Sequence, residues 1–284
     1  MKLILSLIFL FFGPLPLMAQ VDNPEPPSAE GDTSDDVFGD SSQPIDISAE
    51  DGLEWRRDEH LYIARGSAKA IRGKGTAEAD ILMAFYDDTG KKLQRLVGEG
   101  NVVLTSDRTV MTGQHGDYNV PDRFLRLTGD NLSIKTKNET ITSSKAIDYW
   151  AGEKIVKTRG DTKITQKDTV ITSNNSTIYL HKDGSKKGEA YQIESNGNVK
   201  ITTPKQVATA NRLIHNIEKD ISVLTGNVLI VEGDRRIRGD RAEIDHKTGI
   251  SRLLSGGSRV RVNIDPRNPS GSQARPANAA PPTP

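Results

Sequence analysis

The sequence of 284 residues contains no cysteine and few aromatic residues. Without cysteine there can be no disulfide, no thiolate metal site and no cysteine nucleophile. Phe, Trp and Tyr make up only 5% of the residues, and after residue 44 the phenylalanines are Phe85 and Phe124 alone. A closed β-sandwich fills the gap of ~10 Å between its sheets with side chains, bulky aromatics included. A β protein this poor in aromatics therefore indicates a core that a bound ligand completes.

The sequence motifs of common enzymes and metalloproteins are also absent. Nothing resembles the nucleophile elbow of a serine hydrolase, and no predicted helix follows the glycines near Lys74 to form a phosphate-binding loop. The histidines lack the spacing of a metal site. They are His60, His115, His181, His215 and His246. We therefore predict no catalytic residue, no metal site and no cofactor, and we interpret His115 and His215 as packing residues within strands.

The N-terminus has the order of features found in a secretory signal. Lys2 precedes an apolar stretch over residues 3–12, and a small residue, Ala19, closes the segment. The apolar stretch is shorter than the ~20 residues of a membrane-spanning helix, and prolines follow it at once. We predict a cleaved signal peptide over residues 1–19 and export to the periplasm. The alternative is a retained membrane anchor.

Two polar segments flank the body of the chain. Residues 20–44 hold seven acidic residues and no basic residue, which predicts a disordered acidic linker. Residues 265–284 are rich in proline and predict a second disordered tail. Without the seven linker acids and Lys2, residues 45–284 hold 31 acidic and 37 basic residues, a net charge near +6. This moderately basic body suits an anionic partner, whether phosphate, lipid or nucleic acid.

Glycines recur along the body at intervals of 29 to 37 residues, and a short strand-like run follows each one. They are Gly66, Gly100, Gly129, Gly160, Gly197, Gly226 and Gly257. Three of the runs begin Gly-Asn-Val, and apolar residues alternate with mixed ones in nearly all of them. Period-two alternation predicts strands with one buried face. The runs after Gly129 and Gly257 need a one-residue insertion to stay in register.

A second element, rich in small residues, begins seven to ten residues after each run. The segment 237–244, Ile-Arg-Gly-Asp-Arg-Ala-Glu-Ile, is one copy. Its small residues predict positions where the backbone bends or approaches a neighbouring strand closely. A turn and a return strand complete each unit. We therefore predict an all-β protein of about seven short-strand repeats of roughly 30 residues, stacked so that edges are exposed near residues 45–48 and 259–263.

The repeated Gly-Asn-Val-x-Ile strand and the segments 220–231 and 237–244 resemble the LptA family, the OstA-like periplasmic components of lipopolysaccharide export. The resemblance covers residues 45–264. It implies an elongated, open V-shaped β-jellyroll whose splayed sheets hold the acyl chains of lipid A. It further implies a head-to-tail homo-oligomer that joins an LptC-like inner-membrane protein to an LptD-like outer-membrane protein, and no nucleic-acid partner. The acidic linker and the proline-rich tail depart from the core of the family.

The aliphatic residues of the repeat are expected to point together into a cleft that stays open for fatty chains. Burial contributes ~0.8 kcal/mol per CH₂ group, so an acyl chain of about a dozen carbons gains on the order of 10 kcal/mol before ordering costs. The expected lining residues are Val102, Leu104, Leu132, Ile134, Ile164, Val199, Ile201, Val228, Ile230, Ile237, Ile244, Val260 and Val262.

A cluster of arginines surrounds one predicted strand and has two interpretations. The guanidinium groups could bind the phosphates of lipid A at the rim of the groove, since arginine pairs with phosphate in a bidentate fork. They could equally form an ordinary solvated face of the strand. The residues are Arg235, Arg236, Arg238 and Arg241.

Two other functions remain open at this point. One is a membrane-anchored LptC-like subunit of the same export pathway, which the N-terminal apolar stretch permits. The other is a β-solenoid structural or surface protein, whose core is closed by stacked side chains and needs no lipid.

Overall fold

The computed structural model describes residues 43–106, 108–254 and 261–264, with side chains as far as Leu254. All of them belong to the unit Thr33–Pro284. The predicted signal peptide, nearly all of the acidic linker and the C-terminal tail lie outside the described residues, as do Gly257 and Val260. No helix of the described part is long and apolar enough to cross a membrane.

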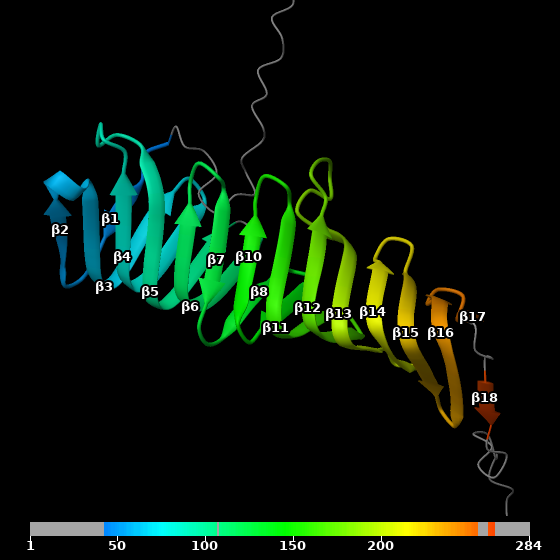
Figure 1. Cartoon of the computed structure of the whole chain (residues 1–284). Helices are drawn as coiled ribbons and strands as arrows, with labels where there is room; N and C mark the ends of the chain where they lie inside the picture. The colour runs from blue at the N-terminus through cyan, green and yellow to red at the C-terminus, as the bar shows by residue number, and fades with distance from the viewer. Residues whose placement is uncertain (1–42, 107, 255–260, 265–284) are drawn as a thin grey trace, which may run out of the picture. The chain divides into compact units, whose positions relative to one another are not determined.

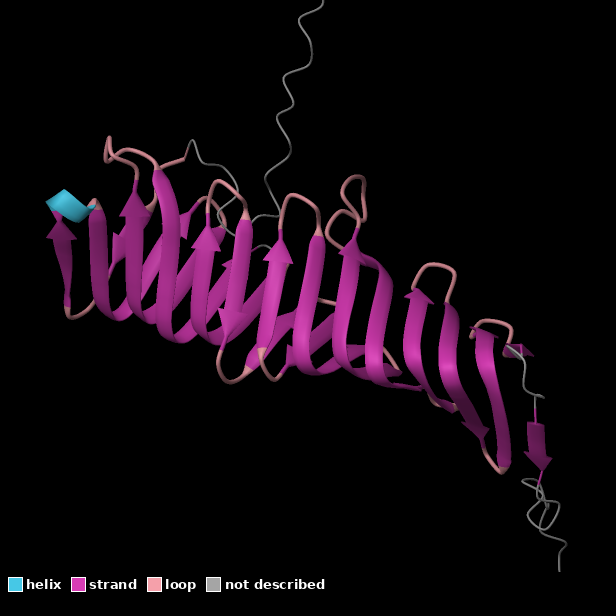
Figure 2. Cartoon of the chain, viewed as in Figure 1, coloured by secondary structure: helices cyan, strands magenta, loops and turns pink. Residues whose placement is uncertain are grey.

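Antiparallel strands make up nearly all of this unit, which confirms the all-β class (Figures 1 and 2). The one helix among the described residues is a 3-10 turn, η1 (Arg57–Glu59). The strands are β1 (Asp46–Ser48), β2 (Gly52–Arg56), β3 (Leu61–Arg72), β4 (Gly75–Tyr86), β5 (Leu93–Ser106), β6 (Thr109–Asn119), β7 (Phe124–Thr128), β8 (Leu132–Lys135), β9 (Glu139–Ser143), β10 (Ala146–Trp150), β11 (Ile155–Gln166), β12 (Thr169–Leu180), β13 (Ala190–Thr202), β14 (Val207–Asn216), β15 (Ile221–Glu232), β16 (Arg235–Asp245), β17 (Ile250–Leu254) and β18 (Arg261–Ile264).

The strands form two layers that share their long strands. The layer that contains β2, β7, β10 and β17 is called sheet I, and the layer that contains β1, β8, β9 and β18 is called sheet II. Each long strand contributes one half to each sheet, with a break in pairing register at the crossing. All connections between the sheets therefore cross along one line of bends, whereas the turns join neighbouring strands within a sheet. This is the jellyroll arrangement expected from the sequence.

The repeated glycines sit at these bends. In β5, Gly100 and Asn101 have φ values of 75° and 48°, and both are skipped in the pairing with β6 between Glu99 and Val102. Glycine adopts a positive φ without strain, and a Cβ on Gly100 would clash with Oδ2 of Asp80. The strand therefore runs through the glycine and turns there into the other sheet. The expectation of a short strand that begins after each glycine was wrong in this respect, because the bend keeps both halves hydrogen-bonded.

The insertion after Gly129 has a visible structural effect. Strand β7 ends at Thr128 and β8 begins at Leu132, so this crossing is split into two strands. The residues around the second insertion, between β17 and β18, lie outside the described residues. Within the described residues, β1 and β18 each pair with a single neighbour and form the edges of sheet II, where the sequence placed exposed edges. Strands β2 and β17 are the corresponding edges of sheet I.

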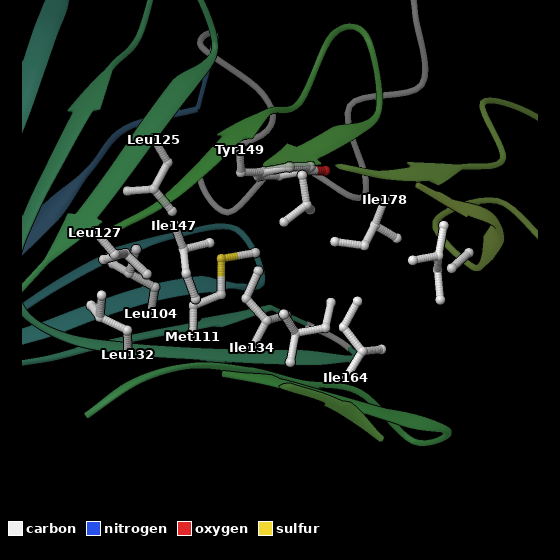
Figure 3. Close-up of a cluster of buried hydrophobic side chains, with 14 of the residues drawn as sticks. Leu104, Met111, Leu125, Leu127, Leu132, Ile134, Ile147, Tyr149, Ile164 and Ile178 are labelled. Atoms are coloured by element: carbon white, nitrogen blue, oxygen red, sulfur yellow. The ribbon is translucent and has the colours of Figure 1, made fainter. Parts of the chain in front are cut away.

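The hydrophobic core lies between the two sheets. Figure 3 shows side chains of both sheets pointing toward one another. Leu104, Ile134 and Ile164 come from sheet II, and Leu125 and Ile178 come from sheet I. All of them are at most 5% exposed. Alternation along each strand puts every second side chain into this interior, which makes it one continuous aliphatic cluster.

Candidate functional site: the interior between the sheets

The side chains predicted to line a lipid groove lie together in this interior. Ile237 is half-buried and packs against the others. Val262 is described only by its backbone, which pairs with Ile237 in the register of β16 and β18. The remaining predicted residues are all at most 5% exposed, and they are Val102, Leu104, Leu132, Ile134, Ile164, Val199, Ile201, Val228, Ile230 and Ile244.

Most of the opposite wall, on sheet I, was missed by the sequence prediction, and Ile244 is the predicted residue that lies there. Its other large apolar residues lie outside the runs that directly follow the repeated glycines, and several inward positions there hold small or polar residues. Gly98, Ser195 and Ser222 are examples. These residues interrupt the apolar alternation from which the lining was read. The large apolar residues of this wall are Leu82, Leu96, Leu125, Leu127, Ile147, Tyr149, Ile178, Ile193, Leu213 and Leu224.

The interior is closed in this structure, in contrast to the open cleft expected from the sequence. The side chains of the two walls pack against one another, because removal of apolar surface from water is favourable. A small cavity, with room for about one water molecule, remains beside Ala77, Leu82, Val102 and Leu125. Any long apolar ligand would have to part the sheets.

Small residues allow the sheets to meet at the bend. Gly98 of β5 and Gly116 of β6 are paired directly, and Val102 lies over both. A Cβ on Gly98 would lie 3.1 Å from Cγ2 of Val102, and a Cβ on Gly116 would lie 3.0 Å from its Cγ1. The close approach predicted for the small-residue element is therefore present here.

The walls are thinnest near the N-terminal end of the described unit. Strands β3 and β4 present buried alanines in place of larger aliphatic residues, and the small cavity lies next to them. Alanine fills the least volume of any apolar side chain with a Cβ, so this part of the interior holds the least side-chain bulk. These alanines are Ala64, Ala68, Ala70, Ala77, Ala79 and Ala84.

A buried cation lies at the rim of sheet II. Arg72, the last residue of β3, follows the inward-facing Ala68 and Ala70 with the same parity and is only 7% exposed. Its Nε and Nη1 atoms are buried and form no hydrogen bond within the described part of the chain. Two buried guanidinium nitrogens without a partner among the described residues are costly, so the site favours an anion. Sequence reasoning gave no signal for it, because Arg72 stands alone outside the arginine cluster.

The predicted arginine rim is dispersed by the fold. Arg236 and Arg238 flank Ile237, which faces the interior, so alternation puts both on the outer face of sheet II. Arg241 lies beyond the bend and precedes the inward-facing Ala242, on the outer face of sheet I. Arg235, paired with Glu232 at the rim, is the member that shares the inward parity of Ile237. All four side chains are exposed.

A carboxyl group at the rim of sheet II has an altered pKa. Glu139 of β9 accepts a hydrogen bond of 2.7 Å from the side-chain nitrogen of Gln166 on β11. Burial raises the pKa of Glu139 to about 6, against the opposing effect of this hydrogen bond. Glu139 therefore changes charge in mildly acidic solution.

A charged seam crosses the outer face of sheet I. Asp148 of β10 accepts hydrogen bonds from Arg126 of β7 at 2.8 and 3.2 Å, and it lies 2.9 Å from Arg159 of β11. The Asp148 side chain is 6% exposed, whereas both guanidiniums remain largely in solvent. The carboxylate thus holds together the strands on either side of β10.

Comparison with known proteins identifies relatives of this chain. The sequence profile described as LptA/(LptD N-terminal domain) LPS transport protein matches twice, over residues 46–151 and 144–250. The overlap contains β10, which ends the first match and begins the second. The uncharacterized protein R00383 of Rhizobium meliloti (strain 1021) is 26% identical over 152 residues, which is 52% of this chain and 74% of that protein.

The comparison with solved structures matches the chain to the crystal structure of LptH, the LptA homologous periplasmic component of the lipopolysaccharide transport device of Pseudomonas aeruginosa. It is 15% identical to this chain and superimposes with a TM-score of 0.40. The match covers 45% of this chain and 95% of the LptH chain.

Proposed function

The chain belongs to the LptA/LptD N-terminal domain family of lipopolysaccharide transport proteins, and from this premise we propose that it carries lipopolysaccharide across the periplasm by holding the acyl chains of lipid A between its two sheets. The observation that carries the proposal is the family match over residues 46–250, which is also the extent of a continuous aliphatic interior. We propose no catalytic step, because carriage of a lipid needs apolar walls and no reacting group.

The architecture supports binding by separation of the sheets. The chain crossings among the described residues lie along the line of bends, so in that part the opposite side can open without breaking a covalent connection. When an acyl chain enters there, the side chains of the two sheets lose contacts with one another and gain contacts with the lipid. Each buried CH₂ group contributes ~0.8 kcal/mol, and the alanine walls of β3 and β4 leave the most room for it.

The buried Arg72 supports an anionic headgroup at the mouth of the interior. Its Nε and Nη1 atoms have no partner within the described residues, and a lipid A phosphate could accept a hydrogen bond from either one. Arg235 has the same inward parity at the opposite end of sheet II and is the member of the arginine cluster that fits this role. The other three arginines lie on outer faces and are not part of the proposed site.

The exposed apolar residues of β2 support end-to-end association of copies. On β2, Leu53 pairs with Ala64 of β3 and Trp55 pairs with Tyr62. On β10, Ile147 and Tyr149 hold the equivalent positions. They pair with Thr158 and Val156 of β11. The internal pair is buried, at 1% and 5% exposure, because β7 covers the other side of β10. The β2 pair, with no strand beyond it among the described residues, is 57% and 44% exposed. A strand docked on β2 would bury it.

The opposite edge of the unit offers a strand of the required kind. Strand β17 pairs with β16 as β7 pairs with β6. In this comparison Arg252 takes the place of Arg126, and Glu54 takes the place of Asp148. If β17 of one copy docks on β2 of the next in the register of β7 and β10, Arg252 meets Glu54 across the junction. We therefore propose a head-to-tail homo-oligomer.

The same free edges would serve the ends of the bridge. An LptC-like inner-membrane protein and an LptD-like outer-membrane protein are the proposed partners, each adding a strand to one edge. Membership of the transport family favours this function over a β-solenoid surface protein. An LptC-like anchored subunit differs only at the N-terminus, and N-terminal sequencing of the exported protein distinguishes the two, with a start at Gln20 supporting the cleaved periplasmic form.

A charge exchange tests the head-to-tail junction. Glu54→Arg and Arg252→Glu should each abolish end-to-end association in light scattering, and the two variants mixed together should associate again. Val110→Lys is a matched control, because Val110 is 36% exposed on the inner strand β6. Association that survives both single exchanges, or that is also lost in Val110→Lys, would contradict the proposed junction.

Extraction of the protein purified from the periplasm, followed by mass spectrometry, tests lipid carriage itself. We expect a co-purified glycolipid that carries acyl chains. A protein that releases no glycolipid, and that binds none when purified lipopolysaccharide is added, would overturn the proposed function.

A further inference from the structure

Two histidines and an aspartate converge near the rim of sheet I in the second half of the unit. His215 is at the end of β14, Asp220 is in the turn before β15, and His246 directly follows β16. The potential ligand atoms of these side chains all lie within 4.8 Å of one another. The residues are separated by up to 31 positions in the sequence, so their spacing along the chain gives no hint of the cluster.

The two imidazoles are aimed at a single point. Nδ1 of His215 lies 3.0 Å from the Oγ atom of Ser222, and Nε2 of His246 lies 2.8 Å from the same atom. His215 and Ser222 are buried, at 3% and 0% exposure. Neutral imidazole is a common ligand of transition-metal ions through either ring nitrogen.

The first half of the unit shows that the fold itself does not require this cluster. Tyr118 pairs with Leu125 as His215 pairs with Ser222. Ala151 donates its backbone N–H to the carbonyl of Arg123 as His246 donates to Asp220, and both acceptor residues have a positive φ. The equivalent positions are thus Tyr118, Arg123, Leu125 and Ala151, which offer no imidazole and no carboxylate. The ligand set is an addition to the second half.

We propose that His215, Asp220 and His246 form a binding site for a divalent transition-metal ion, with Zn²⁺ as the ion of choice. Two imidazole nitrogens and one carboxylate oxygen are ligands that Zn²⁺ accepts, and a site with three protein ligands keeps a fourth position open. In a tetrahedral site with bonds of about 2.0–2.1 Å, ligand atoms lie about 3.4 Å apart. The side chains need to draw together by little more than 1 Å at most.

Ion binding would displace the Ser222 hydroxyl from between the two rings. The ion would then link β14, the turn before β15 and the end of β16, which together form the rim of sheet I in this half. This inference concerns the rim alone and does not depend on lipid carriage.

Zn²⁺ titration of the full mature chain, followed by calorimetry, tests the site. We expect one saturable site per chain, and we expect Co²⁺ to give the visible absorption of a four-coordinate ion with nitrogen ligands. His246→Gln and Asp220→Asn should each weaken the apparent affinity by more than about tenfold, since loss of an outer partner alone costs 10–100-fold. Asparagine tolerates the positive φ of position 220, so Asp220→Asn retains the backbone conformation.

His115→Gln is the matched control. His115 lies on β6 beside Glu99, at 2.9 Å, and outside the cluster. It should leave the affinity for Zn²⁺ and the Co²⁺ spectrum unchanged. The proposal is overturned if the chain binds no stoichiometric Zn²⁺, if the two cluster variants bind as the unaltered chain does, or if binding is lost in His115→Gln instead.

Discussion

The contact between Val102 and two glycines offers a direct test of how the sheets close. In Gly116→Ala, the new Cβ would lie 3.0 Å from Cγ1 of Val102 and 3.3 Å from Cδ2 of Leu127. Val102 and Leu127 are 2% and 0% exposed, and the cavity beside Val102 has room for only about one water molecule, so the new methyl group is only partly accommodated. Overpacking of this kind destabilises a protein by about 1–3 kcal/mol. Alanine also lowers the conformational entropy of the unfolded chain, which stabilises the folded state by up to about 1 kcal/mol. We expect a net loss of about 1–2 kcal/mol in the free energy of unfolding.

The cause can be isolated by removing the methyl groups that the new Cβ meets. Val102→Ala alone should cost about 2–3 kcal/mol, from two lost methyl groups and the cavity they leave. In that background Gly116→Ala should cost nothing or stabilise the protein, which gives a coupling energy of about 1–2 kcal/mol. Urea unfolding of the four proteins, with unchanged m values, measures the cycle.

Gly152→Ala is the matched control, because a Cβ there would meet no atom within 4 Å and the backbone is not left-handed. Its effect should stay within about 0.5 kcal/mol, or stabilise slightly. The reasoning fails if Gly116→Ala costs no more than Gly152→Ala, or if its cost is the same with and without the methyl groups of Val102.

Three further predictions address charged groups. Arg72→Met should raise the free energy of unfolding measured without added lipid, because it removes a buried charge that has two unsatisfied nitrogens. The same substitution should weaken lipopolysaccharide binding by about tenfold or more. Arg236→Gln, on the outer face, should change neither quantity. Glu139 binds its proton more tightly in the folded state, with a pKa of about 6 against an ordinary 4.5, so stability should fall by about 2 kcal/mol as pH rises from 4.5 to above 6. Glu139→Gln should remove that dependence in urea midpoints measured across this range, and an unchanged profile would refute the assignment. Asp148→Ala should lower the free energy of unfolding by about 1–2 kcal/mol, reduced by the exposure of its arginine partners; thermal unfolding at the level of the unaltered chain would show that the seam contributes nothing.

Most of the fold could be predicted from the sequence because of its repeat. Period-two alternation after each glycine identified inward side chains such as Ile164 and Ile201, and the insertion after Gly129 coincides with a split strand. The halves of the long strands that precede the glycines were harder to recognise in the sequence, because small residues such as Gly98 and Ser195 occupy inward positions there. Their small size serves close approach between sheets, which an apolar pattern does not register.

Other features depend on which strands become neighbours. The cluster of His215, Asp220 and His246 is assembled by strand register, and the predicted absence of a metal site rested on spacing along the chain alone. Arg72 is a candidate site residue because it is buried at the end of β3, and its burial depends on the fold. The closed state of the interior could not be predicted either, because the same aliphatic pattern suits a filled core and a lipid groove.

Photo-crosslinking from adjacent positions on β11 tests lipid carriage between the sheets most directly. A photoreactive residue in place of Ile164, which is 1% exposed and faces the interior, should crosslink to the acyl chains of added lipopolysaccharide. The same residue in place of Lys163, which is exposed on the opposite face of the strand, should not. Equal crosslinking from both positions, or crosslinking from Lys163 alone, would contradict the account.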